Sequence, residues 1–269
     1  MFLIPIILLG LMGAYVLCLR GRTGHPGLEA LQGWSYAHRG LHDAARPENS
    51  MSAFRAALES GYGVELDVHL LRDGGLAVIH DGTLRRTTGA EGNVEDLTTD
   101  QLREYHLEGT GETIPTLQQV LELFDGKAPL IIELKAVGSN YGPLCRRVCD
   151  ALAGYDGPYC MESFDPRCVY WLKKHAPQVI RGQLAENFLV AKKRPVPWVL
   201  RFCLTGQLFN FMTRPDFVAY KFADRKRLGN QLGRKLWGVQ GVTWTLKSQT
   251  QHRIALEEGW IPIFEDYTP

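Results

Sequence analysis

The sequence predicts a closed parallel (β/α)8 TIM barrel with an antiparallel hairpin after its second strand and a transmembrane helix at its N-terminus. Two observations predict the barrel. Eight short apolar runs alternate with helical stretches, and several of these runs end in charged residues, where the functional groups of such barrels gather. With 269 residues, the chain is long enough for one large domain of this kind.

The first element is an uncharged segment from Phe2 to Leu19, followed by Arg20 and Arg22. As a helix, its roughly 18 residues would extend about 27 Å, the short end of a membrane crossing. We expect a transmembrane anchor over residues 1–20; a cleaved signal and a buried helix are the alternatives. The arginines after the span favour a single-pass protein of the cell membrane with a cytoplasmic barrel. The five cysteines outside this segment show no spacing typical of disulfides, which agrees with a cytoplasmic barrel.

Residues 21–33 are expected to form a linker and a first helix, and residues 34–269 the barrel domain. The cap candidates Asn49 and Ser50 mark the start of the helix after the first strand. The predicted strands lie near 35–39, 63–69, 130–134, 159–163, 179–183, 217–220, 240–244 and 261–264. The predicted helices cover 50–60, 116–124, 143–153, 166–175 and 249–258.

The apolar run 76–80 follows the second strand too closely to be another parallel strand, because a parallel crossover needs about a dozen residues. The connecting sequence RDGG at 72–75 is typical of a tight turn, so we expect an antiparallel hairpin. A two-residue loop at its centre would place residue 72 opposite residue 75. Paired residue numbers would then sum to 147, which places His80 opposite Asp67.

Acidic and imidazole side chains lie at the ends of the predicted strands. Glu65 and Asp67 share one face of the second strand, and Glu133 ends the third. Buried carboxylates are costly without a cation, and oxygen-only ligands suit hard cations; surface salt bridges are the alternative. His38 and His80 are candidate acid–base groups because imidazole titrates near neutral pH. The alternative for each is a hydrogen-bonded core histidine.

The order of these motifs resembles the glycerophosphodiester phosphodiesterase family. The chain reads HRG at 38–40, PENS at 47–50, ELDV at 65–68, IHD at 79–81 and ELK at 133–135, and the resemblance runs from about residue 36 to the end. It implies the same barrel and a metal-dependent hydrolysis of glycerophosphodiesters to glycerol 3-phosphate and an alcohol. Two features depart from the family pattern. Lys247 stands where the family often has Asn, and the segment 185–222 is longer and more apolar than expected.

The resemblance strengthens the interpretation of five residues. It implies that Glu65, Asp67 and Glu133 hold one divalent cation, Mg²⁺ or Ca²⁺. His38 and His80 would move the two protons that phosphodiester hydrolysis requires.

Four further residues are expected at the substrate or behind the metal ligands. Arg39 and Lys135 suit a phosphate clamp, or they are counter-ions of the acids. Glu48 is a further metal ligand behind the inner set, or it bonds amides at the start of the next helix. Trp244 stacks on glycerol, or it belongs to the barrel core.

The segment 191–212 combines basic residues with large apolar ones, including Trp198, Phe202, Phe209 and Phe211. It is either an ordinary barrel helix with a basic cap or a lid that rests on a membrane. In the second case these rings face outward near the strand ends and contact an acyl chain, so that lysophospholipids become substrates.

Lysophospholipase D activity is therefore one alternative function. Phospholipase C-like cleavage through a cyclic phosphate is another, and a non-catalytic module that binds lipid headgroups is a third. The net charge of +1 provides no long-range attraction to nucleic acid, so we expect no such partner.

Overall fold

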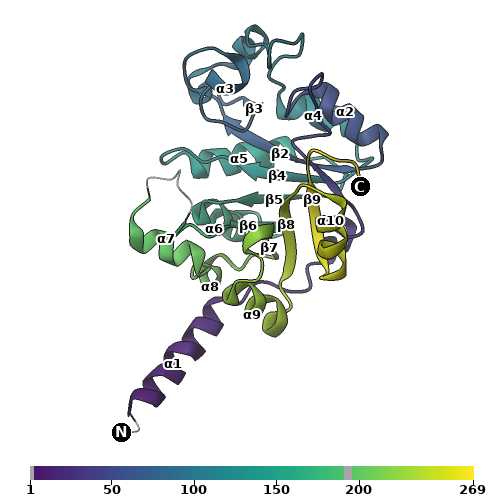
Figure 1. Ribbon diagram of the computed structural model, residues 1–269. Helices are drawn as coiled ribbons and strands as arrows, with labels where there is room; N and C mark the ends of the chain where they lie inside the picture. Colours follow the sequence, from purple (N-terminus) through teal and green to yellow (C-terminus); the bar gives the residue numbers. More distant parts are fainter. Residues whose placement is uncertain (1–2, 191–195) are drawn as a thin grey trace.

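The eight runs predicted as barrel strands form eight parallel strands in residues 3–190 and 196–269, which the computed structural model describes (Figure 1). β1 pairs with both β2 and β9, and this pairing closes the barrel. The predicted strands 130–134 and 159–163 have the observed bounds. The strands are β1 (Tyr36–His38), β2 (Gly63–Leu70), β4 (Leu130–Leu134), β5 (Tyr159–Ser163), β6 (Arg181–Ala185), β7 (Phe217–Lys221), β8 (Gln240–Leu246) and β9 (Trp260–Phe264).

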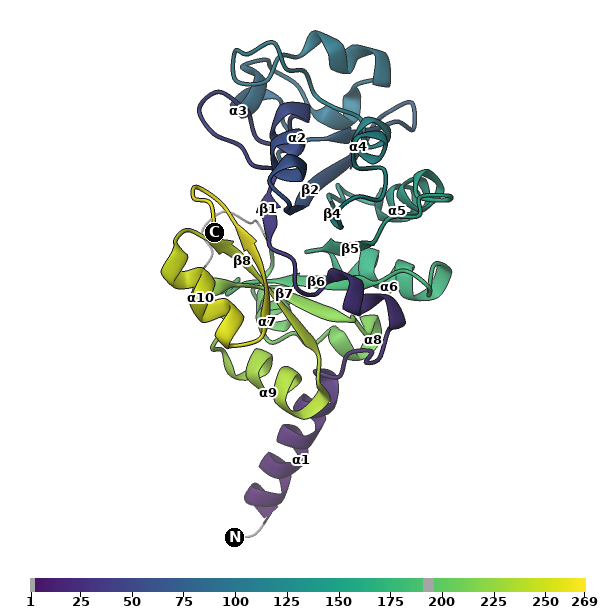
Figure 2. The same ribbon diagram turned by 90° about the vertical axis from the view of Figure 1, so that its right-hand side faces the viewer.

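Helices surround the barrel, and α2, α4, α5, α6 and α10 correspond to the predicted ones (Figure 2). α7 lies in the segment for which an ordinary barrel helix was one interpretation, and its predicted basic cap at 192–194 lies outside the described residues. The helices are α1 (Leu3–Cys18), α2 (Met51–Glu59), α3 (Arg85–Thr88), α4 (Leu117–Phe124), α5 (Tyr141–Ala151), α6 (Pro166–His175), α7 (Trp198–Thr205), α8 (Asn210–Thr213), α9 (Leu228–Trp237) and α10 (Gln249–Glu257).

Polar caps explain why the predicted helices begin where they do. The Ser50 hydroxyl accepts a hydrogen bond from the third amide of α2. Thr116 and Gln119 form a reciprocal capping box at the start of α4. Asp165 caps α6, and Pro166 occupies its first position, where no amide donor is needed.

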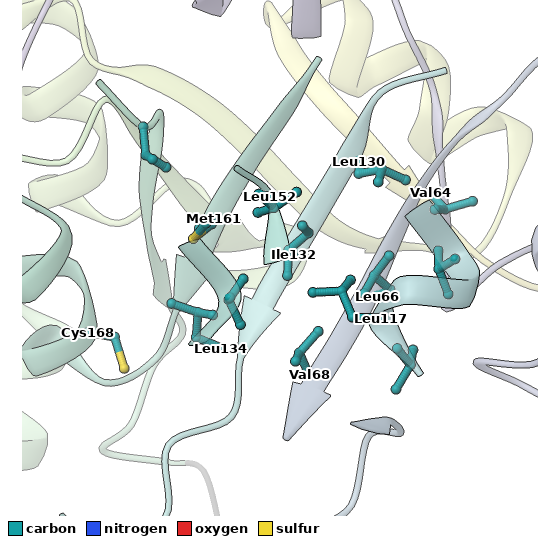
Figure 3. Close-up of a cluster of buried hydrophobic side chains, with 14 of the residues drawn as sticks. Val64, Leu66, Val68, Leu117, Leu130, Ile132, Leu134, Leu152, Met161 and Cys168 are labelled. Carbon is teal, nitrogen blue, oxygen red and sulfur yellow. The ribbon is translucent and has the colours of Figure 1, made fainter. Parts of the chain in front are cut away.

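The alternation of β2 separates an apolar face from an acidic one. Val64, Leu66 and Val68 point away from the barrel axis into the layer between the sheet and the helices. Figure 3 shows them beside side chains of β4 and near Leu117. The intervening Glu65 and Asp67 therefore point into the barrel. Below them, the interior is filled by Leu31, Tyr36, Ile131, Cys160, Ile180, Leu184, Phe217, Ala219, Val242, Ile261 and Ile263.

β3 (Leu76–Val78) pairs antiparallel with the end of β2, beyond the part that pairs with β1. The predicted register is wrong by one residue: Val68 faces Val78, so paired numbers sum to 146. The loop has three residues instead of two, because the Leu71 amide donates to the Gly75 carbonyl at 2.9 Å and Gly74 takes a left-handed conformation with φ of 86°.

The one-residue difference in register changes which residue lies opposite the acidic end of β2. The residue opposite Asp67 is Ile79, whose amide donates to the Asp67 carbonyl at 3.1 Å. His80 therefore does not lie across the strand pair from Asp67, as the predicted register required.

The transmembrane helix predicted over residues 1–20 is wrong for the residues that the structure describes. No helix within residues 3–190 and 196–269 is both long enough and apolar enough to cross a membrane. Membrane association through this helix is therefore not supported.

Residues after α1 lie against the N-terminal end of the barrel. Arg22 forms an ion pair with the buried Asp216, with 2.5 Å between Nε and Oδ1, and also donates to the Val179 carbonyl at 2.9 Å. The predicted first helix is a short 3₁₀ helix, Pro26–Leu31, whose last side chain enters the barrel core. This segment thus packs on the end of the barrel opposite the acidic residues.

Candidate active site

Four buried carboxylates converge at the C-terminal ends of neighbouring strands. β2 supplies Glu65 and Asp67, β4 supplies Glu133, and β5 supplies Glu162. In the parallel registers Asp67 is level with Glu133, and Glu133 is level with Glu162, so these side chains point the same way. One oxygen each from Glu65, Asp67 and Glu133 lies within 4.8 Å of the other two. The structure brings the three predicted ligands together.

Two cations lie within this cluster. Lys135 Nζ is 2.9 Å from both Asp67 Oδ1 and Glu133 Oε1. Burial alone would lower the pKa of Lys135, but these carboxylates outweigh burial and raise it to about 12. Arg39 Nε lies 3.4 Å from Asp67 Oδ2. Burial opposes ionisation of Asp67, but Lys135, His80 and Arg39 hold its pKa well below the ordinary value.

The cations do not balance the acids. Burial raises the pKa of both Glu65 and Glu162 well above the ordinary value, and neighbouring carboxylates raise it further. Glu162 Oε2 is buried and has no hydrogen-bond partner among the described residues. Four carboxylates against two cations leave an excess of two negative charges when all are ionised. A set of oxygen ligands with two uncompensated negative charges fits a divalent cation such as Mg²⁺ or Ca²⁺.

His38 ends β1 beside the acidic cluster. Its Nε2 is 3.8 Å from Glu65 Oε2, and its Nδ1 is 3.0 Å from Glu265 Oε2. Burial lowers the pKa of His38, whereas the Glu265 carboxylate opposes that shift. Glu265 is itself 2.7 Å from Lys247 Nζ, and these partners hold its pKa well below the ordinary value. Lys247, the departure from the family pattern, thus belongs to the surroundings of His38.

His80 reaches the same place from a bend after β3. Its Nδ1 is 2.6 Å from Asp81 Oδ1, and burial lowers the pKa of His80 to about 4. Arg86 forms ion pairs with both Asp81 and Glu48: its Nε is 2.6 Å from Asp81 Oδ2, and its Nη2 is 2.6 Å from Glu48 Oε1. His69 Nε2 lies 3.3 Å from the His80 carbonyl.

Glu48 lies behind the acidic cluster rather than within it. Its Oε1 is 3.0 Å from Arg39 Nη1 and 2.6 Å from Arg86 Nη2. The cap of α2 is formed by Ser50. Glu48 therefore orients the guanidinium groups of the site.

A small cavity of about 130 Å³ lies between these groups. It is lined by His38, His80, Glu65 and Glu133, with Trp244 forming part of its wall. The Trp244 ring meets Phe164 edge to face at 5.6 Å, and its Nε1 donates to a backbone carbonyl of β7 at 3.0 Å. The ring is thereby held in place beside the acid–base candidates.

The segment predicted to contact an acyl chain has two faces. Trp198, Phe202 and Phe211 are exposed, as expected for outward rings, and Trp198 stacks on Phe202 with 6.0 Å between centroids. Phe209 differs, because it lines a second and larger cavity beside the site. Residues 191–195 of this segment lie outside the described residues.

Comparison with known proteins identifies the family. Residues 38–268 match the model of the glycerophosphoryl diester phosphodiesterase family. The chain belongs to this family. The match extends from the last residue of β1 past the end of β9 and includes every residue of the acidic cluster. It confirms the family and the enzyme class predicted from the sequence.

Individual relatives agree with this assignment. A glycerophosphodiester phosphodiesterase from Caldanaerobacter subterraneus subsp. tengcongensis is 37% identical over 172 residues, which are 60% of this chain and 68% of the relative. One from Bacillus altitudinis is 43% identical over 113 residues, 39% of this chain and 46% of the relative. This chain thus spans about two thirds of the first relative and less than half of the second.

A solved structure supports the fold. An Oleispira antarctica phosphodiesterase in complex with the product sn-glycerol-3-phosphate superposes with a TM-score of 0.74 at 22% identity. The alignment covers 91% of this chain and 96% of that one. It confirms the predicted barrel.

Glu162 and Glu265 belong to the site but had no predicted role. Glu162 ends an apolar run in the same way as Glu133, so the signal that identified Glu133 was also present for Glu162. Glu265 lies in the closing FEDY motif at 264–267, but its proximity to His38 depends on closure of the barrel between β9 and β1.

Proposed function

We propose that this protein hydrolyses glycerophosphodiesters to glycerol 3-phosphate and an alcohol, with one divalent cation, Mg²⁺ or Ca²⁺. The observation that carries the proposal is that two imidazoles, each oriented by a carboxylate, line the same small cavity as the acidic cluster. Membership in the family supports the substrate class.

Glu65, Asp67 and Glu133 are the residues that would hold the cation. When bound, a divalent cation supplies positive charge that neutralises a phosphodiester and polarises its oxygens. Arg39 and Lys135 already lie in the cluster as counter-ions. Bound substrate would offer them phosphate oxygens in place of part of their carboxylate contacts.

The two histidines supply the proton chemistry. Glu265 engages Nδ1 of His38 and Asp81 engages Nδ1 of His80, so Nε2 of each ring is the atom left for the reacting groups. One imidazole accepts a proton from the attacking water, and the other donates a proton to the departing alcohol oxygen. Trp244, on the wall of the same cavity, is placed to contact the glycerol moiety.

The first experiment tests metal dependence. Purified protein is incubated with glycerophosphocholine and Mg²⁺, Ca²⁺ or EDTA, and products are followed by ³¹P NMR, which also separates a cyclic phosphate from glycerol 3-phosphate. We expect glycerol 3-phosphate with a cation and none with EDTA. Glu65→Gln and Glu133→Gln should abolish turnover with the fold retained, whereas Glu91→Gln at an exposed position should keep it. Full turnover by exhaustively chelated protein would refute the metal requirement.

The second experiment tests the histidines. His38→Ala and His80→Ala should each lower kcat by about 10² to 10⁴ while the cation still binds. His106→Ala, at an exposed position outside the site, is the matched control. A near wild-type kcat in either active-site variant would show that the proton moves by another route.

A further inference from the structure

A second cavity opens beside the catalytic one. Its volume is about 730 Å³, and it shares His80, Glu133 and Phe164 with the small cavity. Ligand sites in proteins usually measure about 300 to 1,000 Å³. The two cavities adjoin at the three residues that they share, and the proposed reaction on a small water-soluble diester needs only the polar region around them.

The lining of the larger cavity changes along its length. Near the acidic cluster it is polar, with His80, Glu133 and Lys135. Away from the cluster it becomes apolar, because the segment that contains α7 and α8 turns one face toward the loops after β4 and β5. The apolar part is lined by Val137, Phe164, Phe188, Leu200, Leu204, Phe209 and Met212.

This arrangement matches an amphiphile whose phosphate lies at the acidic cluster. We infer that the apolar part, here called the α7 groove, binds a single hydrocarbon chain attached to the phosphodiester. The preferred substrates are then glycerophosphodiesters that carry one long chain. The inference rests on the proposed function. A small diester would leave the α7 groove to water, whereas a chain would bury its apolar walls.

The hydrocarbon chain can be attached to either side of the phosphodiester, and the reaction is the same in both cases. The oxygen of water bonds to phosphorus as one imidazole takes its proton, the bond from phosphorus to the alcohol oxygen breaks, and the other imidazole donates a proton to that oxygen. A chain on the glycerol, as in a lysophospholipid, remains in an acyl glycerol phosphate. A chain on the alcohol leaves as a long-chain alcohol beside glycerol 3-phosphate.

Two chain-length series test the inference. One consists of 1-acyl glycerophosphocholines from acetyl to decanoyl, and the other of glycerophosphoalkanols from ethanol to decanol, all below their micelle concentrations. We expect kcat/KM to rise with chain length in at least one series, by up to about fourfold for each buried methylene. The series that rises identifies the attachment point.

Failure of this inference differs from failure of the proposed function. Turnover of glycerophosphocholine with kcat/KM flat in both series would overturn the α7 groove and leave the proposed function standing. No turnover of any diester in the presence of cation would overturn the proposed function, and the inference with it.

Amino-acid substitutions in the α7 groove test where the hydrocarbon chain binds. Leu204→Trp fills the α7 groove, and Leu200→Arg places a charge at a position that is already 37% exposed and tolerates a polar side chain. Each should lower kcat/KM for the decanoyl or decanol substrate at least tenfold more than for glycerophosphocholine. The control, Trp198→Ser on the outward face of the same helix, should leave both values unchanged.

Two results would overturn the assignment of the chain to this groove. One is an unchanged chain-length dependence in both groove variants, whose folding is checked by circular dichroism. The other is loss of that dependence in Trp198→Ser alone, which would place the chain on the exposed rings.

Discussion

Glu162 and Glu265 show how single carboxylates shape the site. Glu162 adds a fourth acid to a cluster that already exceeds its counter-ions, and its pKa is raised by burial and by the neighbouring acids. Glu265 instead gains cationic and imidazole partners, and its pKa is lowered. The first therefore strengthens the demand for a cation, and the second orients the imidazole of His38.

Glu265→Gln should alter proton transfer at His38. The carboxylate raises the pKa of His38 against the effect of burial, so its removal lowers that pKa further. In the pH profile of kcat/KM, the limb that reflects the titration of His38 should move to lower pH. We expect kcat to fall by less than the roughly 10² to 10⁴ for loss of the imidazole itself. Asp266→Asn, at an exposed neighbour, should leave the profile in place, and an unmoved limb in Glu265→Gln would contradict the assignment.

His80 should make the metal-free protein less stable at mildly acidic pH. Burial lowers its pKa from 6.5 to about 4, so between these values the unfolded chain binds a proton that the folded chain does not. The stability associated with neutral His80 is complete above pH 6.5 and is lost as the pH falls toward 4.

Urea unfolding at pH 7, 6 and 5 in EDTA tests this pH dependence of stability. The free energy of unfolding of wild type should fall more steeply than that of His80→Asn, by up to about 1.4 kcal/mol per pH unit. Asn retains a donor for Asp81, which accepts from His80 in wild type. Parallel pH dependences would show that His80 titrates normally in the fold.

At the scale of elements, β2 and its hairpin position one side of the site. β2 pairs with β1 at its start, with β3 at its end and with β4 on its other edge. The three-residue loop sets the register of β3, and the bend after β3 returns His80 to the site despite the shift. The conformation of one glycine in this loop is therefore important for the catalytic geometry.

Gly74→Ala should destabilise the protein by about 1 to 2 kcal/mol, because an L-residue is strained in the left-handed region. The added Cβ would lie at an ordinary 3.6 Å from Arg147, so the conformation alone sets this cost. Gly111→Ala is the control, since its Cβ would meet nothing within 4 Å and its φ is not left-handed. Chemical denaturation measures both variants, and equal stabilities would contradict the strained loop.

At the scale of the whole molecule, the segment after α1 belongs to the fold. Arg22 reaches the buried Asp216, which also accepts from the Arg181 amide at 2.9 Å. The contact joins the N-terminal segment to the strands β6 and β7, more than 150 residues away. The predicted location at a cell membrane is a separate matter and stays a prediction.

Arg22→Ala should destabilise the barrel by about 3 kcal/mol, because it leaves the buried Asp216 carboxylate without its ion-pair partner. Arg20→Ala should cost less than about 1 kcal/mol, since Arg20 is exposed and only lies over the Trp237 ring at 5.3 Å. Thermal and urea unfolding of the two variants provide the comparison. Similar losses would mean that the N-terminal segment contributes through packing rather than through this ion pair.

The sequence by itself determined the strands, the barrel and the inward-facing acids, because these follow from local patterns. Apolar runs predicted β4 and β5 residue for residue. Alternation along one strand put Glu65 and Asp67 on the same face, and the residues at the strand ends predicted the cation site.

Only the tertiary structure decided what depends on contacts between distant segments or on one residue of register. His38 meets Glu265 across 227 positions of sequence, a contact that no local pattern records. The loop of the hairpin took three residues instead of two because Gly74 permits a left-handed turn, and that moved His80 off the predicted pair. The groove beside α7 likewise exists only because helices and loops far apart in the chain pack around one cavity, and hydrophobicity alone does not say which of their rings face it.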